Sequence, residues 1–302
     1  MRNLSRNIPL VSIIVPTYNR AHCIARTIKS VIDQTITDWE LIIIDNNSTD
    51  STLEIISSFS DERISTSQIE NNGIVAASRN LGIRLSRGKY VAFLDSDDWW
   101  VPEKLEIALR QLESGSDLVY HDMRTITQLP VVAKKHLRVA TGALTCPVVI
   151  DLLSNGNPIF TSSVVVRTTL LGQINGMSEI PDLVGSEDFD TWIRLAKLTD
   201  KFHRLDPVLG YYWEGGGNLT SAKTKITNLL LLRQRYKTEL IKTVGTEYPG
   251  WMLYGLARGS LALGSFTDAR RYSWLSIGSN LAFSLKVRAV LVWVSTLMRL
   301  KF

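Results

Sequence analysis

Three carboxylates, Asp95, Asp97 and Asp98, lie within one short segment of the sequence, KYVAFLDSDDWW. Carboxylates crowded this closely repel one another unless they face water or share a cation. Their hard oxygen atoms suit Mg²⁺ or Mn²⁺, ions that proteins typically bind together with the phosphates of a substrate. The segment therefore indicates a metal–diphosphate site, although a solvated acidic turn is the simpler explanation of an isolated Asp-x-Asp.

Apolar runs that end in polar side chains occur at three places in the first hundred residues. The runs are Tyr90–Leu94, which precedes the three carboxylates, Val11–Asn19 and Glu40–Asp50. Short runs rich in Val, Ile and aromatic residues are typical of buried strands. The second run ends in Pro16, Thr17, Tyr18 and Asn19, and the third ends in Asp45, Asn46, Asn47, Ser48 and Asp50. Each predicted strand thus ends in groups that can bind a ligand.

Two segments between these strands, Ala21–Gln34 and Thr49–Phe59, carry apolar residues at helical spacing. Strands that alternate with helices in this way predict an α/β fold with a mostly parallel, Rossmann-like sheet and right-handed crossovers. In such sheets the carboxyl ends of the strands share one edge, where ligands bind. We therefore expect the three polar clusters to converge on a single crevice.

A turn at residues 71–73, Asn-Asn-Gly, and a predicted helix, Ile74–Ser86, precede the acidic strand. Arg79 and Asn80 lie on this helix. Ordinary helix surface is the simpler explanation of both residues, and taken alone Arg79 is explained equally well in this way.

Taken together, five segments of the chain resemble family-2 glycosyltransferases of the GT-A fold. In chain order they are VSIIVPTYNR, LIIIDNNSTD, NNGIVAASRNLGI, GKYVAFLDSDDWW and GSEDFDTWIRLA. The resemblance covers roughly Pro9–Ser221 and implies a GT-A domain over residues 1–221. It further implies an inverting, metal-dependent transfer of a sugar from a nucleotide-diphosphate donor, UDP-linked, in surface polysaccharide or glycolipid synthesis. The acceptor implied is a glycan or a lipid-linked sugar.

The resemblance also assigns roles to individual positions around the predicted crevice. Residues implied to line the base and ribose pocket are Pro16, Thr17 and Tyr18, and those implied to face the nucleobase edge are Asp45 and Asn46. Residues implied to border the donor pocket are Asn72, Gly73, Arg79 and Asn80, with Asp95 on the ribose or diphosphate side. The implied Mn²⁺ or Mg²⁺ is held directly by Asp97, with support from Asp98. Many members of the family have a second acid where this chain has Asn46.

A second acidic pair, Glu187 and Asp188, matches the catalytic end of the family pattern. Inverting transfer is an in-line displacement in which the acceptor hydroxyl loses a proton, so a carboxylate is needed as general base. The resemblance gives this role to Asp188 and an orienting role to Glu187. Alternatively, both acids cap the predicted helix Phe189–Leu198, since acids favour the first turn of a helix.

Composition limits the other classes of function. The chain of 302 residues carries a net charge of +5, with pI about 9.2. It has no zinc-finger or recognition-helix pattern, so we expect no nucleic-acid partner but attraction to an anionic membrane or lipid-linked substrate. Phosphate-binding and dinucleotide-binding glycine loops are missing from the sequence. No signal peptide or membrane span is evident, and the two cysteines fit a reducing compartment, so we expect a cytoplasmic location.

The last eighty residues change character. Residues 222–302 predict a C-terminal helical region that contains one helix hairpin, Trp251–Leu263 with Asp268–Ile277. The tail Ser284–Phe302 is apolar with basic residues near both ends. Such a tail suits peripheral contact with the inner face of the cell membrane; packing against its own domain explains it equally well.

Two further expectations concern the segment Gly210–Ser221, GYYWEGGGNLTS. Its glycines indicate a loop able to close over the donor. Its aromatic residues suit either stacking on a sugar or a strand packed into the core.

Two rival functions remain at this stage. A nucleotidyltransferase can use a similar sheet and metal, but the segment PTYNRAHC lacks the glycine-rich loop that would hold a triphosphate. The other rival function is that of a catalytically inactive scaffold that binds a glycan or a nucleotide. The presence of Asp95, Asp97 and Asp188 weighs against such a scaffold.

Overall fold

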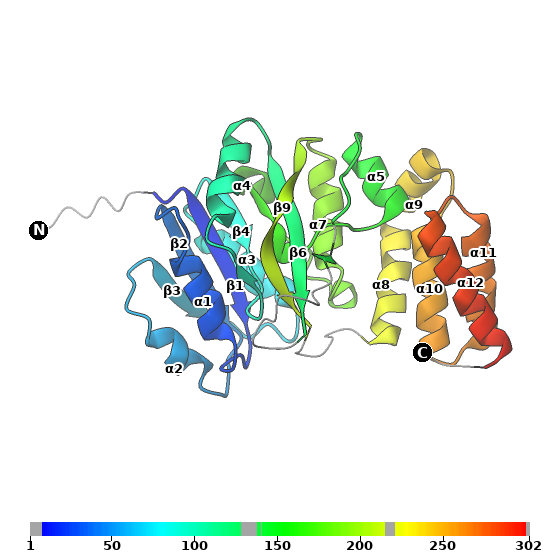
Figure 1. The fold of residues 1–302 in the computed structure, drawn as a ribbon, viewed down its shortest axis with the longest axis horizontal. Helices are drawn as coiled ribbons and strands as arrows, with labels where there is room; N and C mark the ends of the chain where they lie inside the picture. The colour runs from blue at the N-terminus through cyan, green and yellow to red at the C-terminus, as the bar shows by residue number, and fades with distance from the viewer. Residues whose placement is uncertain (1–7, 128–137, 140, 215–220, 300–302) are drawn as a thin grey trace, which may run out of the picture. The chain divides into compact units, whose positions relative to one another are not determined.

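The computed structural model describes residues 8–127, 138–139, 141–214 and 221–299 (Figure 1). The chain divides into two compact units, each built from three segments. The first unit contains residues 1–143, 158–177 and 201–217, and the second contains residues 144–157, 178–200 and 218–302. The single boundary after residue 221 that we expected lies close to the last of these divisions. The segments 144–157 and 178–200, however, belong with the C-terminal helices.

The first unit begins with four parallel strands whose order in the sheet is β3-β2-β1-β4. Their bounds are β1 Val11–Thr17, β2 Trp39–Asp45, β3 Ile64–Gln68 and β4 Tyr90–Phe93. The helices that connect them are α1 Ile24–Ile32, α2 Thr52–Ser57 and α3 Val75–Leu85. These elements confirm the predicted strand–helix alternation and its parallel sheet, and they add β3, which the apolar pattern did not indicate.

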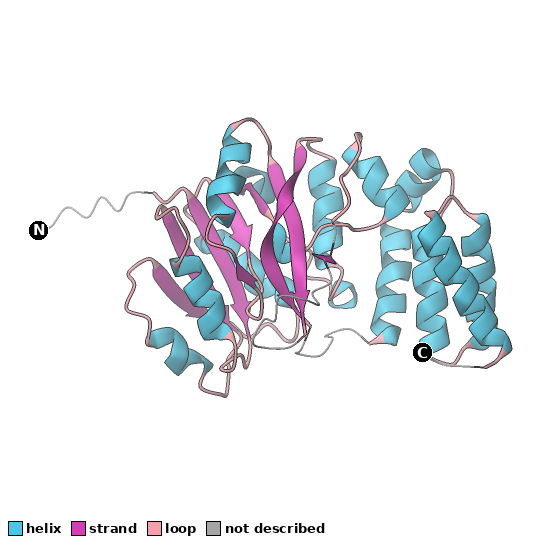
Figure 2. Cartoon of the chain, viewed as in Figure 1, coloured by secondary structure: helices cyan, strands magenta, loops and turns pink. Residues whose placement is uncertain are grey.

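The sheet becomes mixed beyond β4 (Figure 2). Its order continues β4-β8-β6-β9-β5, with β7 paired to β6, which gives nine strands within the described residues. The pair β6–β9 is parallel, whereas β4–β8, β6–β8, β5–β9 and β6–β7 are antiparallel. The bounds are β5 Trp99–Trp100, β6 Leu118–Ile126, β7 Arg138–Val139, β8 Val165–Arg167 and β9 Phe202–Trp213. Three helical segments complete this unit: α4 Lys104–Glu113, the short 3₁₀ turn Thr161–Ser163 and α6 Thr168–Gln173.

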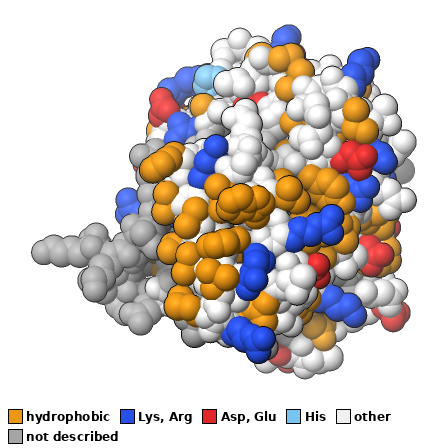
Figure 3. All heavy atoms as spheres, turned by 90° about the vertical axis from the view of Figure 1, so that its right-hand side faces the viewer, with side chains coloured by type: hydrophobic (Ala, Val, Ile, Leu, Met, Phe, Trp, Pro, Cys, Tyr) orange, Lys and Arg blue, Asp and Glu red, His pale blue; other side chains and the backbone are white. Residues whose placement is uncertain are grey.

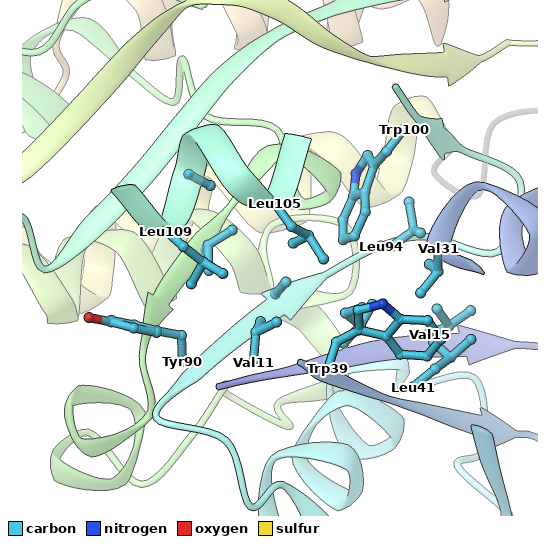
Figure 4. Packing of buried hydrophobic residues seen from close by; sticks show 14 of the residues in the cluster. Val11, Val15, Val31, Trp39, Leu41, Tyr90, Leu94, Trp100, Leu105 and Leu109 are labelled. Atoms are coloured by element: carbon cyan, nitrogen blue, oxygen red, sulfur yellow. The ribbon is translucent and has the colours of Figure 1, made fainter. Parts of the chain in front are cut away.

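Both faces of the central strands are covered, which explains their nearly continuous apolar sequences. On one face, side chains of β1 such as Val11 and Val15 pack with residues of α1 and α4, including Val31 and Leu105 (Figure 4). On the other face, Gly82 of α3 lies directly against Ile14, and a Cβ at this glycine would come within 2.4 Å of the Ile14 side chain. The absence of a side chain at Gly82 therefore lets α3 approach β1 closely.

The second unit is helical. Its elements are α5 Val148–Asn155, the 3₁₀ turn Pro181–Leu183, α7 Glu187–Ala196, α8 Ala222–Arg235, α9 Lys237–Glu239, the π-helical turn Leu240–Val244, α10 Gly250–Ala262, α11 Phe266–Gly278 and α12 Phe283–Leu297. Helix α10 packs against α8, α11 and α12, with Leu261 and Val292 in the shared core. The predicted hairpin is thus confirmed as α10 and α11. Among the described residues, no helix combines the length and apolar character needed to cross a bilayer.

Candidate active site

The carboxyl ends of β1 and β2 lie side by side because Thr17 and Asp45 are paired in the parallel register. The backbone N–H of Asn46 donates to the carbonyl of Thr17 at 2.9 Å, which extends this pairing beyond the strands. Asp45 is fully buried, and its two carboxylate oxygens accept from the backbone N–H and the hydroxyl of Ser48. The carboxylate therefore closes the turn after β2. Tyr18, next to Thr17, is 52% exposed.

The turn before α3 is fastened to this edge through Asn46. The Asn46 side-chain oxygen accepts from the backbone N–H of Asn71 at 2.8 Å. Asn72 and Gly73 follow with φ of 52° and 80°, a left-handed conformation that Gly and Asn adopt most readily. The described residues provide no partner for the side-chain NH₂ of Asn46, which leaves a donor beside the strand ends.

Arg79 and Asp95 form an ion pair at 2.7 Å in which the arginine side chain is almost fully buried. The backbone N–H of Asp95 donates to the hydroxyl of Ser162 at 3.0 Å. Contacts therefore fix both the side chain and the backbone of Asp95. Asn80, in contrast, binds the backbone N–H and carbonyl of Met177. It fixes the loop at residues 176–177, and the donor-pocket role implied by the family pattern stays a prediction.

Asp97 and Asp98 occupy different environments although they are adjacent. Asp98 is 1% exposed; its Oδ1 accepts from the backbone N–H of Trp213 at 2.9 Å, while its Oδ2 has no hydrogen-bond partner among the described residues. The Asp97 side chain is 25% exposed, and one of its carboxylate oxygens lies 3.6 Å from the guanidinium of Arg20. A buried oxygen without a partner beside a partly exposed carboxylate is an arrangement that a hard cation would relieve.

Helix α1 fixes the backbone of this acidic turn. The hydroxyl of Thr27 lies 2.8 Å from the carbonyl oxygens of both Ser96 and Asp98. The guanidinium of Arg26 donates to the carbonyl of Asp97 at 2.9 Å. Side chains of α1 therefore hold the backbone of this turn in place, and the fixed backbone keeps the carboxylates close together.

The electrostatic effect of this crowding extends to its neighbours. Burial, followed by the charge of Asp95, raises the pKa of Asp97, and burial with the charges of Asp95 and Asp97 raises the pKa of Asp98 well above its ordinary value. Burial and the same acidic charges raise the pKa of Tyr212 to about 12. Burial and the charge of Asp97 raise that of Cys23 to about 11. Burial is the first cause of each of these shifts, and the neighbouring carboxylates add to it.

Aromatic side chains line the same region. Trp99 of β5 stacks on Tyr211 of β9 with ring centroids 5.0 Å apart, and the guanidinium of Arg26 lies 3.8 Å from the centre of the Trp99 ring. Tyr212 contacts Phe160, with ring centroids 5.7 Å apart. The aromatic run of the segment Gly210–Ser221 is therefore part of a strand. The glycines expected to form a closing loop, at 215–217, lie outside the described residues.

Three side chains of this site were missed by the sequence analysis, those of Arg20, Arg26 and Ser162. Trp213 was considered there only as one of the aromatic residues suited to a sugar or to the core, and its backbone contact with Asp98 was not expected. Arg20 directly follows the polar end of β1, so its position was a signal that could have been used. Ser162 and Trp213 come from distant parts of the chain, and nothing in their local sequence indicates that they contact Asp95 and Asp98.

Glu187 and Asp188 lie in the second unit, in the first turn of α7, which begins two residues earlier than predicted. Glu187 is buried, and its carboxylate accepts from the backbone N–H of Gly185 at 2.6 Å. Asp188 accepts from the backbone N–H of Phe189 at 2.6 Å and lies 3.3 Å from the side-chain nitrogen of Asn157. Both acids are placed as helix-capping acids would be. This position does not prevent them from having a catalytic role.

A third acid on α7, Asp190, fixes this helix within the unit. It is fully buried and accepts from Arg194, from Arg235 and from the hydroxyl of Tyr236, at 2.6–2.7 Å. The two residues from α8 and its end, Arg235 and Tyr236, thereby hold the helix that carries Glu187 and Asp188.

Solved structures with a similar fold include crystal structures of S. aureus TarS. One, in complex with UDP, matches with a TM-score of 0.60 and 21% identity, over 95% of this chain and 80% of that chain. Another, in complex with UDP-GlcNAc, has a TM-score of 0.59 and 18% identity, and the match covers 95% of this chain and 90% of that chain. At these identities the similarity establishes the fold alone.

Sequence comparisons identify relatives at higher identity. TuaG of Bacillus subtilis (strain 168), whose name assigns it to teichuronic acid biosynthesis, is 33% identical over 72% of this chain and 84% of its own length. WfgD of Escherichia coli, a UDP-Glc:alpha-D-GlcNAc-diphosphoundecaprenol beta-1,3-glucosyltransferase, is 35% identical over 62% of this chain and 70% of its own. The profile of the family described as Glycosyl transferase family 2 matches residues 12–164. The fold, the acidic strand edge and these matches agree, and the chain belongs to glycosyl transferase family 2.

Proposed function

We propose that this protein transfers a sugar, with inversion, from a UDP-linked donor to a lipid-linked or glycan acceptor in the synthesis of a cell-surface polysaccharide. The observation that carries the proposal is the acidic end of β4. There a partly exposed carboxylate, Asp97, adjoins a buried one, Asp98, that has an unpartnered oxygen. The relatives named above, which act in teichuronic acid synthesis or on a diphosphoundecaprenol-linked sugar, support the class of acceptor.

The donor set at this edge fits Mn²⁺ or Mg²⁺. Within the described residues no group of three or more His, Cys, Asp or Glu side chains could hold a metal ion unaided. Proteins usually bind Mg²⁺ through one or two carboxylates, and phosphates of the substrate supply further ligands. Asp97 would hold the ion directly and Asp98 would support it. Once bound, the ion would disperse the charge that develops on the leaving diphosphate.

Groups at the ends of β1 and β2 are suited to a uridine. The free side-chain NH₂ of Asn46 can donate to a carbonyl oxygen of the base, a role that an acid at this position could not fill. The exposed ring of Tyr18 offers an apolar face for the base or ribose. Solved structures of TarS with UDP and UDP-GlcNAc, which share the fold, are consistent with a uridine donor.

Transfer itself requires a group that accepts the acceptor's proton. We assign this role to Asp188. The acceptor oxygen forms a bond to the anomeric carbon as the bond from that carbon to the diphosphate oxygen breaks, and the hydroxyl proton passes to the carboxylate. Glu187, buried and bonded to the backbone of Gly185, would hold the first turn of α7 in shape.

A donor panel tests the proposal directly. Purified protein is incubated with UDP-, GDP- and dTDP-sugars, with and without Mn²⁺, and the released nucleoside diphosphate is measured with and without a diphosphoundecaprenol-linked GlcNAc acceptor. We expect release only from UDP-sugars, stimulated by both metal and acceptor. Formation of a nucleotide sugar from a nucleoside triphosphate and a sugar phosphate would instead identify a nucleotidyltransferase. Absence of turnover, with tight binding of UDP retained, would identify an inactive binding protein.

A further inference from the structure

Helix α12 buries its small residues and exposes its large apolar ones. Its buried positions are Ala289, Val292, Ser295 and Thr296. Its exposed apolar positions are Phe283, Val287, Val290, Leu291 and Leu297, with Met298 at the helix end. Their spacing of three and four residues places the exposed side chains in one stripe along the helix. Phe283 is 82% exposed and Leu291 is 60% exposed, so within the described residues this stripe is not part of a core.

Helix α11, which packs on α12, has the same inverted pattern. Ala269, Ser273 and Ser276 are buried along its inner side. Trp274 is 64% exposed and Leu275 is 47% exposed on its outer side. An amphipathic helix of a protein that is fully surrounded by water normally shows the reverse arrangement. Two neighbouring helices therefore share an outward apolar surface.

Basic residues are concentrated in the same part of the chain. From residue 250 to the end there are seven Lys and Arg but only one acid, Asp268. The whole chain has 34 Lys and Arg and 29 Asp and Glu, so the first 249 residues contain 27 basic and 28 acidic residues. The entire positive net charge thus comes from the last 53 residues. Asp268 accepts a hydrogen bond from Ser265, and in the part of the chain that the structure describes no ion pair neutralises Arg271 or Arg299.

A hollow of about 840 Å³ lies between α11 and α12. Its lining includes three arginines, Arg270, Arg271 and Arg299, and two tryptophans, Trp274 and Trp293, whose ring centroids are 6.2 Å apart. Among the described residues, no acid lines it. Arg270 donates to the hydroxyl and the carbonyl of Thr296, which are neutral acceptors, and no described residue forms an ion pair with it. The hollow combines positive charge with apolar walls.

The hollow adjoins the apolar stripe. Trp293 lies three residues after Val290 and four before Leu297, so these side chains follow one another along the same flank of α12. Figure 3 looks onto the side of the second unit that carries α11 and α12, and it shows apolar side chains gathered there with Lys and Arg between them. We call this surface the α11–α12 face. It consists of Trp274, Leu275, Phe283, Val287, Val290 and Leu291 with the arginines of the hollow.

We propose that the α11–α12 face binds the surface of a membrane that contains anionic phospholipids. The aliphatic and aromatic side chains enter the boundary between headgroups and acyl chains, and the arginines of the hollow bind lipid phosphates. Charge complementarity selects this occupant. A second copy docked through the same face would bring two sets of unpaired arginines together. This property is independent of the transferase activity, since it requires neither donor nor acceptor.

Vesicle flotation of the full chain tests the proposal. The probes are vesicles of phosphatidylcholine alone and of phosphatidylcholine with phosphatidylglycerol. We expect flotation with the anionic vesicles, weakened by added salt because exposed charges are screened over about 10 Å at 0.1 M. Glycerol phosphate, a soluble headgroup, should compete only weakly because it offers nothing to the apolar stripe.

Matched variants separate the contribution of the basic residues to vesicle binding from that of the apolar residues. Replacing Arg271 and Arg299 by Gln should lower vesicle affinity about 25-fold, at about fivefold for each basic residue near an anionic leaflet. Leu291→Ser should lower it about tenfold, since it removes a buried apolar side chain from the interface. The control for the arginine variant is Lys223→Gln with Lys225→Gln, which removes the same charge from the exposed side of α8. The control for Leu291→Ser is Leu198→Ser, at a residue of the same unit that is 47% exposed. Neither control should change flotation.

Several outcomes would overturn the proposal. Wild-type protein that fails to float with anionic vesicles contradicts it, as does equal loss of binding in the controls. Protein that binds glycerol phosphate but not vesicles would make the hollow a site for a soluble anion. Sedimentation that shows a dimer, lost in Leu291→Ser, with no vesicle binding, would make the face an interface between copies. Circular dichroism of every variant establishes that the loss is not unfolding.

Discussion

Two aspartates, one in each unit, are buried to the same degree but have opposite surroundings. Asp98 of the first unit is 1% exposed and Asp190 of the second is 0% exposed. Asp190 accepts from two arginines and a tyrosine hydroxyl. Asp98 accepts from one backbone N–H and has an oxygen without a partner in the described part of the chain.

The difference is the one that we expect between a structural carboxylate and the proposed binding one. A buried charge is tolerated when protein groups neutralise it, as the arginines neutralise Asp190, and such a group has little capacity left for a ligand. A buried carboxylate without a cation is strained electrostatically, and its pKa rises, as that of Asp98 does. The environment, and not burial itself, therefore distinguishes the two roles. Asp122 of β6, also fully buried, is paired with Arg204 at 2.9 Å and belongs to the structural kind.

Asp188→Asn should have the largest effect, because it removes the proposed general base. Amide and carboxylate have similar shapes, but the amide cannot accept the acceptor's proton. We expect the transfer rate to fall by about 10²–10⁴-fold, the usual contribution of positioned base catalysis. Affinity for UDP and the unfolding midpoint should be unchanged. Initial rates with a verified acceptor provide the measurement, and Asp182→Asn, an exposed acid of the same segment, is the control. Near wild-type transfer would exclude Asp188 as the base.

Asp190→Asn should affect stability. It leaves Arg194 and Arg235 without their anion in a buried site, and breaking a buried ion pair by removing one partner typically lowers the free energy of unfolding by about 3–5 kcal/mol. Urea unfolding measures the change, with Asp268→Asn, on the exposed side of α11, as control. A loss below about 1 kcal/mol, the range of surface ion pairs, would show that Asp190 is not the anchor that we describe.

The comparison also explains which parts of the fold could be predicted. Strands β1, β2 and β4 are covered on both faces, so their apolar runs are long and unmistakable. Strand β3, with sequence ISTSQ, lies at the sheet edge and is largely exposed, which removes the apolar signal. The antiparallel half of the sheet depends on pairings between segments far apart in the sequence, such as β4 with β8. No local pattern indicates such pairings.

The same reasoning applies to the site. Asp95, Asp97 and Asp98 were found because they are adjacent in sequence and follow a strand. Their different electrostatic states depend on Ser162, Arg26 and Trp213, which reach them through the tertiary fold. The contacts of Asn80 with the backbone of Met177 likewise join segments that are far apart in the sequence, and no local pattern indicates them.

Replacing Asp97 tests whether the carboxylates at the end of β4 bind a metal ion, as we propose. In Asp97→Ala, Mn²⁺ should no longer strengthen UDP binding, because the proposed direct ligand is gone. Asp98→Asn should reduce metal affinity by about 10–100-fold, the effect typical of a supporting residue. Calorimetric titration of UDP with and without Mn²⁺ measures both, and Asp33→Asn, an exposed acid at the end of α1, is the control. Unchanged metal-assisted binding in Asp97→Ala would show that the acidic turn is not the metal site.

Lys104 extends the comparison to a buried cation, and its replacement should have the smallest effect. The residue is fully buried, its Nζ lies 3.6 Å from the centre of the Trp100 ring, and it has no hydrogen-bond partner among the residues that the structure describes. Burial lowers the pKa of Lys104 well below its usual value. Burial, followed by the charge of Lys104, lowers the pKa of the nearby His121 to about 3. Within the described residues, Lys104 Nζ thus lacks a hydrogen-bond partner, as Asp98 Oδ2 does.

The pH dependence follows from the direction of this shift. Between the lowered pKa and the ordinary lysine value of about 10.4, the unfolded chain binds a proton at Lys104 that the folded chain has released. Stability then rises with pH across this window, and at neutral pH the lysine destabilises the fold. Lys104→Met should raise the free energy of unfolding by about 1 kcal/mol or more near neutral pH, and the gain should shrink toward about pH 10. Urea unfolding at the two pH values measures this, with the exposed Lys29→Met as control. A destabilised Lys104→Met, or a gain that does not change with pH, would show that Lys104 is charged and neutralised in the fold, as Asp190 is.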